Sequence, residues 1–413
     1  MQINYLFAAI PMFVGFMLIE YFYAKSKGWK YFNMHNSLTN ISIGIAERLA
    51  DVFIAGAFFF VYDYIQKEHG LFSIKASIGV WIILFLLTDF VWYWYHRLAH
   101  EINVLWLAHV VHHQSEDFNY TVSARITVLQ AIARTCFWCV LPFIGFPAPM
   151  ITSLLLVHGL YPFFIHTRTI GKLGFLEYIL VTPSHHRVHH ASNEKYLDRN
   201  YGDVLIIWDK LFGTFAKEDE KEVIKFGLTH PLQTHSFLRQ HLHFAVELWL
   251  AMKSKRGLLN KLRVLIAKPE TLEPTLRHRA EEIFHIRRNP KAITQPLNKY
   301  VIVQFLFLLV GLTLFIAFEH QVPLSSKVCW GLIVILTLIN CGAIMEQKKW
   351  VFEVELIRLS AFLLLAFEYS AFISVNFFLT FLLSIVVLLQ FQRLREYYLK
   401  LIYRTNERSE SSA

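Results

Sequence analysis

The 413 residues are too apolar for an ordinary soluble protein: 55% are hydrophobic, only 17% are charged, and the mean hydropathy is +0.40. Soluble domains carry about a quarter charged residues, so the composition excludes that class. The net charge of +9 does not indicate nucleic-acid binding, because no basic cluster is interleaved with aromatic residues.

Nine apolar stretches are long enough to cross a bilayer as helices, since about 20 apolar residues span the hydrocarbon core. The first has neither the basic start nor the small-residue cleavage site of a secretory signal, so we expect a retained helix. In chain order the stretches cover residues 3–24, 41–62, 77–95, 126–146, 149–166, 300–318, 328–345, 351–369 and 371–391. The sequence therefore predicts an all-α, polytopic membrane protein.

The basic residues predict the topology. If the N-terminus lies outside, the outside loops hold only Lys67, Lys75 and Lys327, and all other loops lie in the cytoplasm. Both long polar segments, 96–125 and 167–299, are then cytoplasmic and form a histidine-rich helical cap. The membrane is a bacterial inner membrane or the endoplasmic reticulum, which the sequence does not distinguish.

Four parts follow from these patterns. They are a catalytic membrane domain (1–245), a basic cytoplasmic connector (246–299), a membrane domain of four spans (300–392) and a basic tail that ends in disorder (393–413).

Three histidine clusters occupy the cytoplasmic segments. The first cluster is His96-x-x-x-His100, the second is His109-x-x-His112-His113, and the third is His186-x-x-His189-His190. On a helix, residues three and four apart share a face, so each cluster directs its imidazoles to one side. Imidazole binds Fe, Zn, Cu and Ni, and eight converging ligands are too many for one ion. The clusters therefore predict two metal ions.

Other polar residues near the clusters are further candidates. Asp89 shares a helical stripe with His96, and it either accepts a ring N–H from a ligand histidine or makes a helix–helix hydrogen bond. His166, at the end of the fifth stretch, and His185, directly before the third cluster, are additional metal-ligand candidates. His158 lies inside an apolar stretch and is interpreted as a packed helix residue.

The clusters and their flanking blocks resemble a known family. The blocks are YWYHRLAHEINVLWLAHVVHHQSEDFNYTVSAR (93–125) and IHTRTIGKLGFLEYILVTPSHHRVHHASNEKYLDRNYGDVLIIWDKLFGTF (165–215). They resemble the fatty acid hydroxylase/sterol desaturase superfamily over about residues 80–245, and within it the branch of alkylglycerol monooxygenases.

This resemblance implies an O2-dependent oxidoreductase with two iron ions on the eight clustered histidines. It implies an ether-lipid substrate, hydroxylated next to the ether oxygen to give fatty aldehyde and glycerol, with tetrahydrobiopterin as external electron donor. It also places Asn200 and Asp209 as supporting groups beside the third cluster. A loop turn for Asn200 and a helix cap for Asp209 remain the alternatives. The sequence does not predict the oligomeric state.

Two classes of alternative function remain. The same metal centre could hydroxylate or desaturate a fatty acyl chain or a sterol. A membrane cytochrome or a metal transporter fits less well, because haem histidines lie singly on facing helices and transporters bind ions near mid-bilayer.

Overall fold

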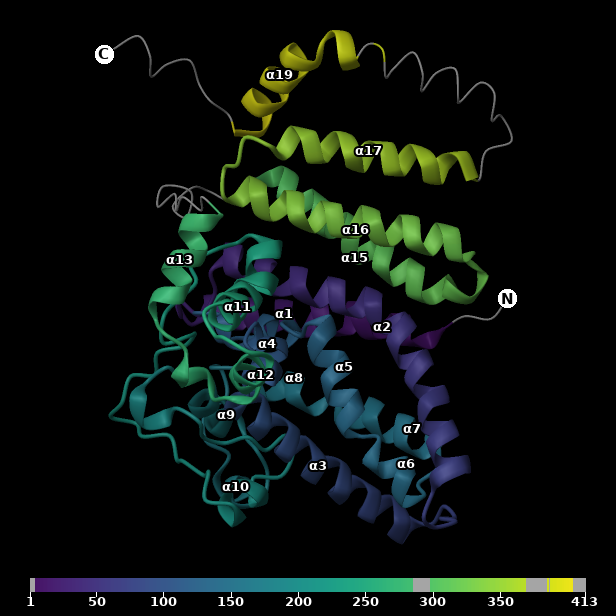
Figure 1. Ribbon diagram of the computed structural model, residues 1–413, viewed down its shortest axis with the longest axis vertical. Coiled ribbons are helices and arrows are strands. Elements are labelled where there is room, and N and C mark those ends of the chain that lie inside the picture. The colour runs from purple at the N-terminus through teal and green to yellow at the C-terminus, as the bar shows by residue number, and fades with distance from the viewer. Residues whose placement is uncertain (1–3, 285–297, 369–384, 386, 404–413) are drawn as a thin grey trace. The chain divides into compact units, whose positions relative to one another are not determined.

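The computed structural model describes residues 4–284, 298–368, 385 and 387–403 (Figure 1). Within these residues the regular structure is helical, with two isolated β-bridges and no strand, so the all-α prediction is confirmed. The chain divides into two compact units. We call residues 12–233 and 239–287 the histidine unit, and residues 1–11, 234–238 and 288–413 the C-terminal unit.

Long helices open the histidine unit, and short ones follow. The long ones are α1 (Ala9–Ser26), α2 (Met34–His69) and α3 (Ile78–Glu101). Asn33 and Ser77 cap the starts of α2 and α3, each accepting backbone N–H groups of the first turn. The later helices are α4 (Asn103–His109), α5 (Val128–Phe137), α6 (Val140–Ile144), α7 (Ala148–His158), α8 (Tyr161–Ile165), α9 (Pro183–His189), α10 (Ile207–Leu211), α11 (Phe237–Lys253), α12 (Leu258–Ile266) and α13 (Thr275–Ile283).

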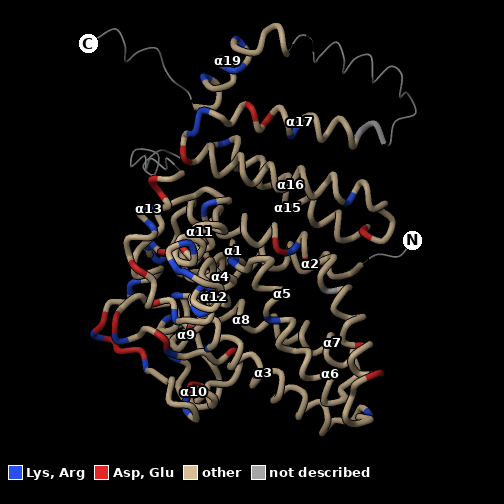
Figure 2. Tube along the Cα trace, in the orientation of Figure 1, with Lys and Arg blue, Asp and Glu red and all other residues tan. Residues whose placement is uncertain are grey.

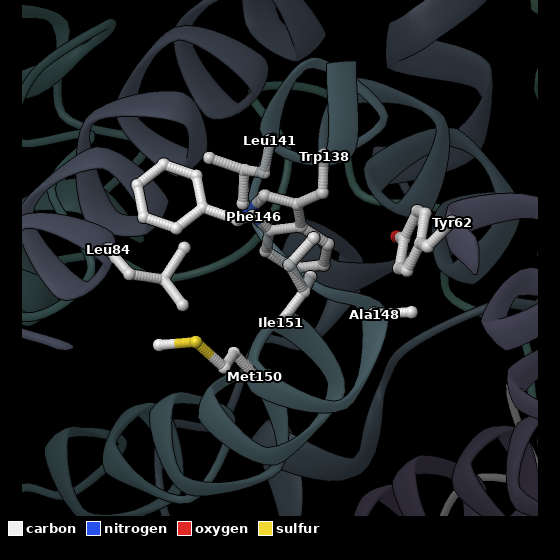
Figure 3. Close-up of a cluster of buried hydrophobic side chains, with 8 residues drawn as sticks. All are labelled: Tyr62, Leu84, Trp138, Leu141, Phe146, Ala148, Met150 and Ile151. Carbon is white, nitrogen blue, oxygen red and sulfur yellow. The ribbon is translucent and has the colours of Figure 1, made fainter. Parts of the chain in front are cut away.

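A hydrophobic core joins four of these helices (Figure 3). Tyr62 of α2 and Leu84 of α3 meet Trp138 and Leu141 from the α5–α6 segment, and Ile151 of α7 closes the cluster. All five side chains are buried. Burying an aliphatic or aromatic side chain stabilises a fold by about 1.5–3 kcal/mol, so this cluster fixes α3 relative to its neighbours.

Five helical segments of the described chain are long and apolar enough to cross a membrane: Tyr5–Ser26, Ile78–Glu101, Ala148–Ile165, Lys299–Gln321 and Leu324–Met345. Of the other predicted spans, 41–62 lies inside the longer α2, and 126–146 is split between α5 and α6, which form a shorter apolar stretch. The predicted span 351–369 coincides with the helix Val351–Glu368, which is not among these five. Most of 371–391 lies outside the described residues. The segments around α9–α13 are not candidate spans. Figure 2 shows that Lys, Arg, Asp and Glu gather around them, whereas most of α3 is uncharged.

The C-terminal unit contains α15 (Lys299–Phe318), α16 (Leu324–Met345), α17 (Val351–Glu368) and α19 (Phe391–Tyr403). A buried ion pair of Arg358 and Glu355 lies among these helices, although the sequence suggested almost no polar chemistry there. Glu355 also accepts from the Tyr300 hydroxyl at 2.9 Å and from the Asn340 amide at 2.9 Å. Charges in such a setting are tolerated when they are paired and hydrogen-bonded.

Candidate metal centre

Three helices of the histidine unit present the clusters at their C-terminal ends. The first cluster lies on the last turns of α3. The second begins on the last residue of α4 and continues into the 3₁₀ turn His112–Gln114. The third lies on α9 and on the residue that caps it. Helical spacing therefore aligns the imidazoles within each cluster, as the sequence predicts.

Imidazoles from all three clusters converge in a five-histidine group, which comprises His96, His100, His109, His113 and His189. One ring nitrogen of each residue lies within 4.8 Å of those of the others. Nε2 of His109 is 3.0 Å from Nε2 of His96 and 3.0 Å from Nε2 of His113. All of these side chains except His100 are buried.

A second, four-histidine group adjoins the first. It comprises His112, His166, His186 and His190, all of them buried. Nε2 of His166 lies 2.9 Å from Nε2 of His186 and 3.2 Å from Nε2 of His112. The rings of His113 and His190 stack with centroids 4.4 Å apart, so the two groups share a boundary.

The spacing of the ring nitrogens fits metal coordination. A metal–imidazole bond is about 2.1 Å long, and two such bonds at a right angle place their nitrogens about 3.0 Å apart. The closest Nε2 atoms in both groups lie 2.9–3.2 Å apart. Two sets of nitrogens therefore suit two adjoining ions, and five plus four imidazoles match the preference of Fe, Zn, Cu and Ni for this ligand.

Electrostatics keeps these imidazoles in the neutral form that binds metal. Burial, reinforced by the neighbouring imidazoles, lowers the pKa well below the ordinary 6.5 for His109, His112, His113, His186, His189 and His190. Burial disfavours the charged imidazolium, and close rings would repel one another if they were protonated. A ring without a proton on Nε2 offers its lone pair to an ion.

One short loop, residues 198–201, orients three members of the five-histidine group. Nδ1 of His96 donates to the Tyr201 carbonyl at 2.8 Å, and Nδ1 of His189 donates to the Arg199 carbonyl at 2.9 Å. The Asp198 carboxylate lies 3.6 Å from Nδ1 of His100. Ring N–H groups held in this way direct the opposite nitrogens, Nε2, into the group.

Comparison with known proteins gives a consistent result. Residues 81–214 match the family model described as fatty acid hydroxylase. The human protein named alkylglycerol monooxygenase is 36% identical over 374 residues, which cover 88% of this chain and 82% of the human one. The chain belongs to the fatty acid hydroxylase family. It is an oxidoreductase, and the resemblance predicted from the sequence blocks is confirmed.

Two more relatives of this hydroxylase carry the same name, alkylglycerol monooxygenase. The protein of Xenopus tropicalis is 34% identical over 370 residues, and that of Danio rerio is 32% identical over 371 residues. In both comparisons the alignment covers 88% of this chain and 82% of the relative. No solved structure matches the chain.

Asp89 of the hydroxylase contacts His158 instead of a clustered histidine. Its Oδ1 lies 3.0 Å from Nε2 of His158, whose Nδ1 lies 2.9 Å from Asp203. Asp89 also accepts from the backbone N–H groups of Val204 and Leu205 and from the Trp208 indole. The carboxylate thus joins α3, α7 and the 203–208 segment, so the helix–helix alternative describes it better than contact with a ligand histidine.

Asn200 and Asp209 hold the loop that orients the five-histidine group. Asn200 has a left-handed backbone (φ 58°) and donates to the carbonyls of His185 and Ala216. Asp209 accepts from the backbone N–H of Tyr201 at 2.7 Å and of Gly202 at 2.8 Å. Burial raises the pKa of the Asp209 carboxyl, and these hydrogen bonds oppose that effect. Both residues act through backbone, and in the described part of the chain neither forms a hydrogen bond to a clustered imidazole.

The two additional histidine candidates have different surroundings. His166, the C-cap of α8, belongs to the four-histidine group, and its Nδ1 donates to the Pro162 carbonyl at 2.5 Å. His185 lies outside both groups, and its Nδ1 instead accepts from the Thr182 backbone N–H at 3.2 Å, which caps α9.

Sequence reasoning missed the orienting carbonyls of Arg199 and Tyr201, because a carbonyl carries no side-chain signal. It also missed Asp203, whose partner His158 lies 45 positions earlier in the chain. An intramembrane histidine needs a polar partner, and that rule was the one available signal.

Proposed function

We propose that the protein is a di-iron, O2-dependent membrane monooxygenase that hydroxylates the ether-adjacent carbon of alkylglycerols. The convergence of nine imidazoles into two adjoining groups carries this proposal. The names of relatives up to 36% identical support the substrate class. Each of the two groups holds one iron, and the ligands are the eight cluster histidines and His166.

When bound, iron ions on these histidines would supply the redox chemistry and the Lewis acidity that activate O2 toward an unreactive C–H bond. Overall, the substrate, one O2, two electrons and two protons give the hydroxylated lipid and one water. The product is a hemiacetal, which collapses to a fatty aldehyde and glycerol. The electrons come from an external donor, for which we propose tetrahydrobiopterin.

The protein's own residues contribute orientation and exclusion of water. The 198–201 loop and the Pro162 carbonyl fix ring tautomers, which leaves the Nε2 atoms free for metal. Phe118 is buried and lies over the four-histidine group, with its ring centroid 5.2 Å from that of His190. Such a shell lowers the local dielectric and keeps bulk water from the reacting centre.

We further propose the nine-span topology, with the histidine groups on the cytoplasmic side of a bacterial inner membrane or the endoplasmic reticulum. The distribution of Lys and Arg in the loops supports that orientation. The division into a catalytic part, a connector at 246–299, a membrane part at 300–392 and a tail stays a prediction alongside it.

The proposal is tested with purified protein in detergent and a chimyl-type alkylglycerol, O2 and tetrahydrobiopterin. We expect two irons per chain and release of fatty aldehyde. His112→Ala should lose iron and activity together, whereas the matched control His185→Ala, a buried histidine outside both groups, should keep its iron. Two irons without aldehyde would overturn the substrate and favour acyl or sterol hydroxylation or desaturation. One haem, or no transition metal at all, would overturn the whole proposal.

A further inference from the structure

The short helix α12 of the histidine unit carries apolar side chains on two sides, and only one side is buried. Val264 faces the interior, where it belongs to a buried cluster with Leu248, Ala251 and Leu276. Four large apolar side chains of the same helix are exposed: Leu258 (74%), Leu259 (64%), Leu262 (47%) and Ile266 (67%). At about 100° per residue, these four lie within one sector of about 100° and form a continuous surface, which we call the α12 stripe. Single exposed leucines are ordinary, but a continuous apolar stripe indicates an interaction surface.

Basic residues surround the α12 stripe. Between Leu248 and Pro269 the chain contains no acidic residue and six basic ones, which are Lys253, Lys255, Arg256, Lys261, Arg263 and Lys268. All six are exposed, and in the described part of the chain only Lys268 forms an ion pair, with Glu270 at 3.9 Å. An apolar stripe flanked by exposed Lys and Arg is typical of a helix that lies in the interface of an anionic bilayer.

Two hydrogen bonds hold α12 at one end of α3. The helix α3, which is long and apolar enough to cross a membrane, ends at Glu101, and Asn103 follows two residues later. The backbone N–H of Asn103 donates to the Ala267 carbonyl at 2.9 Å, and its side-chain amide donates to the Val264 carbonyl at 2.8 Å. Asn103 also begins α4, which lies beside α12 (Figure 1). The α12 stripe is therefore held close to the point where α3 ends at the membrane surface.

We propose that α12 is an interfacial helix that binds the anionic leaflet at which α3 ends. The α12 stripe enters the boundary between headgroups and acyl chains, and the surrounding Lys and Arg contact the lipid phosphates. The helix has nine residues, too few to cross the hydrocarbon core, so it lies along the surface. Because α4 carries His109 as its last residue, this contact sets the height of the five-histidine group above the leaflet. The inference goes beyond the proposed reaction and does not depend on it.

Charge and hydrophobicity together favour a leaflet over other occupants. A second copy of the chain that packed through the same stripe would bring the two sets of basic residues against each other, because a two-fold interface uses the same surface on both copies. A purely polar acidic partner would neutralise the basic residues but leave four large apolar side chains in water. An anionic leaflet accommodates both features, since its phosphates attract Lys and Arg and its acyl boundary takes up the stripe.

The test measures amide hydrogen exchange of the full-length protein, so it needs neither substrate nor turnover. Wild-type protein is reconstituted into nanodiscs of phosphatidylcholine alone or of phosphatidylcholine mixed with phosphatidylglycerol. We expect exchange across α12 to be slower in the mixture by about tenfold or more, since each Lys or Arg near an anionic surface strengthens binding about fivefold. The difference between the two lipid compositions should disappear at about 1 M NaCl, where the Debye length falls to about 3 Å.

Paired variants separate the apolar part of the surface from the basic part. Leu259→Gln combined with Leu262→Gln removes the middle of the α12 stripe, and Lys261→Gln combined with Arg263→Gln removes charges beside it. Either pair should lose most of the slowing caused by phosphatidylglycerol. The control Val223→Gln changes a side chain that is 82% exposed outside α12, and it should behave like wild type.

Wild-type exchange that is equal in both lipid compositions would overturn the inference, and so would slowing that persists in both paired variants. Slow exchange already present in detergent at the mass of two copies, and unchanged in nanodiscs, would assign the stripe to a second copy instead. A pair that also alters exchange in α13 has disturbed the buried cluster that Leu276 shares with Val264. In that case the lipid and salt dependence of the wild-type protein decides the outcome.

Discussion

Asp209→Asn tests how the protein orients a metal-binding histidine through backbone. The carboxylate is fully buried and accepts from the N–H groups of Tyr201 (2.7 Å) and Gly202 (2.8 Å) and from the Thr214 hydroxyl (2.7 Å). The Tyr201 carbonyl then receives Nδ1 of His96 at 2.8 Å. Asparagine has the same shape, so the substitution changes charge and hydrogen bonding while the packing is kept.

The magnitude follows from these three contacts. Hydrogen bonds to a charged group contribute about 1.5–3 kcal/mol each, and neutral ones contribute about 0.5–1.5 kcal/mol. The amide oxygen of the introduced asparagine can keep the bonds to Tyr201 and Thr214 in weakened form, but its NH2 faces the Gly202 N–H and leaves that donor without an acceptor. We expect a loss of about 2–4 kcal/mol in stability. Loss of a supporting partner typically lowers metal affinity by about 10–100-fold.

The assay is competition for iron by a chelator of known affinity, run beside thermal unfolding in the same detergent. Asp219→Asn, at an exposed carboxylate on the same unit, is the control for charge loss. Gly202→Ala is a second way to disturb the contacts between Asp209 and the loop, since its added Cβ would lie 2.9 Å from the Asp209 carboxylate and 2.7 Å from the Leu205 carbonyl. Iron retention equal to wild type in Asp209→Asn, despite a lowered melting temperature, would refute the link from Asp209 to His96.

Three further predictions follow from other parts of the structure. His166→Ala should remove iron from the four-histidine group and leave the five-histidine group loaded, so iron per chain falls toward half; complete retention in an elemental assay would contradict its role. The metal-free protein should lose stability as pH falls below 6.5, because the histidines of the unfolded chain then bind protons, whereas the buried histidines of the folded chain, with their lowered pKa values, do not. Each such histidine lowers the free energy of unfolding by up to about 1.4 kcal/mol per pH unit. A melting temperature that stays constant between pH 7 and 5 would contradict this. Arg358→Met should destabilise the C-terminal unit by about 3–5 kcal/mol by leaving Glu355 buried and unpaired, and the double change with Glu355→Met should recover most of that loss in thermal unfolding.

The grouping of the histidines could be predicted from sequence because it depends on local geometry. Spacings of three and four place side chains on one helical face, and this rule holds wherever the helix lies. The partition into a five-histidine and a four-histidine group could not be predicted, because it mixes all three clusters. His112 and His113 are neighbours in the chain and belong to different groups. That division depends on how α3, α4 and α9 pack against one another, a long-range property.

The supporting residues show a second limit of sequence reasoning. Asp89 is on the same helical stripe as His96, which suggested a contact between them, but its partner comes from α7. A shared stripe shows that two side chains point to the same side of one helix, but it does not show which other helix lies on that side. His166 could be named only as an additional ligand candidate for the same reason, because its place in the four-histidine group depends on the end of α8 lying against α9.

The two histidine groups differ in how many of their rings are held by neighbouring acceptors. The loop at 198–201 supplies oriented acceptors to three rings of the five-histidine group, so that group is held by rigid backbone. Within the described chain, Nδ1 is buried without an acceptor in two of the four rings of the four-histidine group, His112 and His186, and in one of the five rings of the other group, His109. Changes at Asp209 should therefore act first on metal retention in the five-histidine group. Iron per chain that falls toward half in Asp209→Asn would support this difference, whereas equal loss from both groups would contradict it.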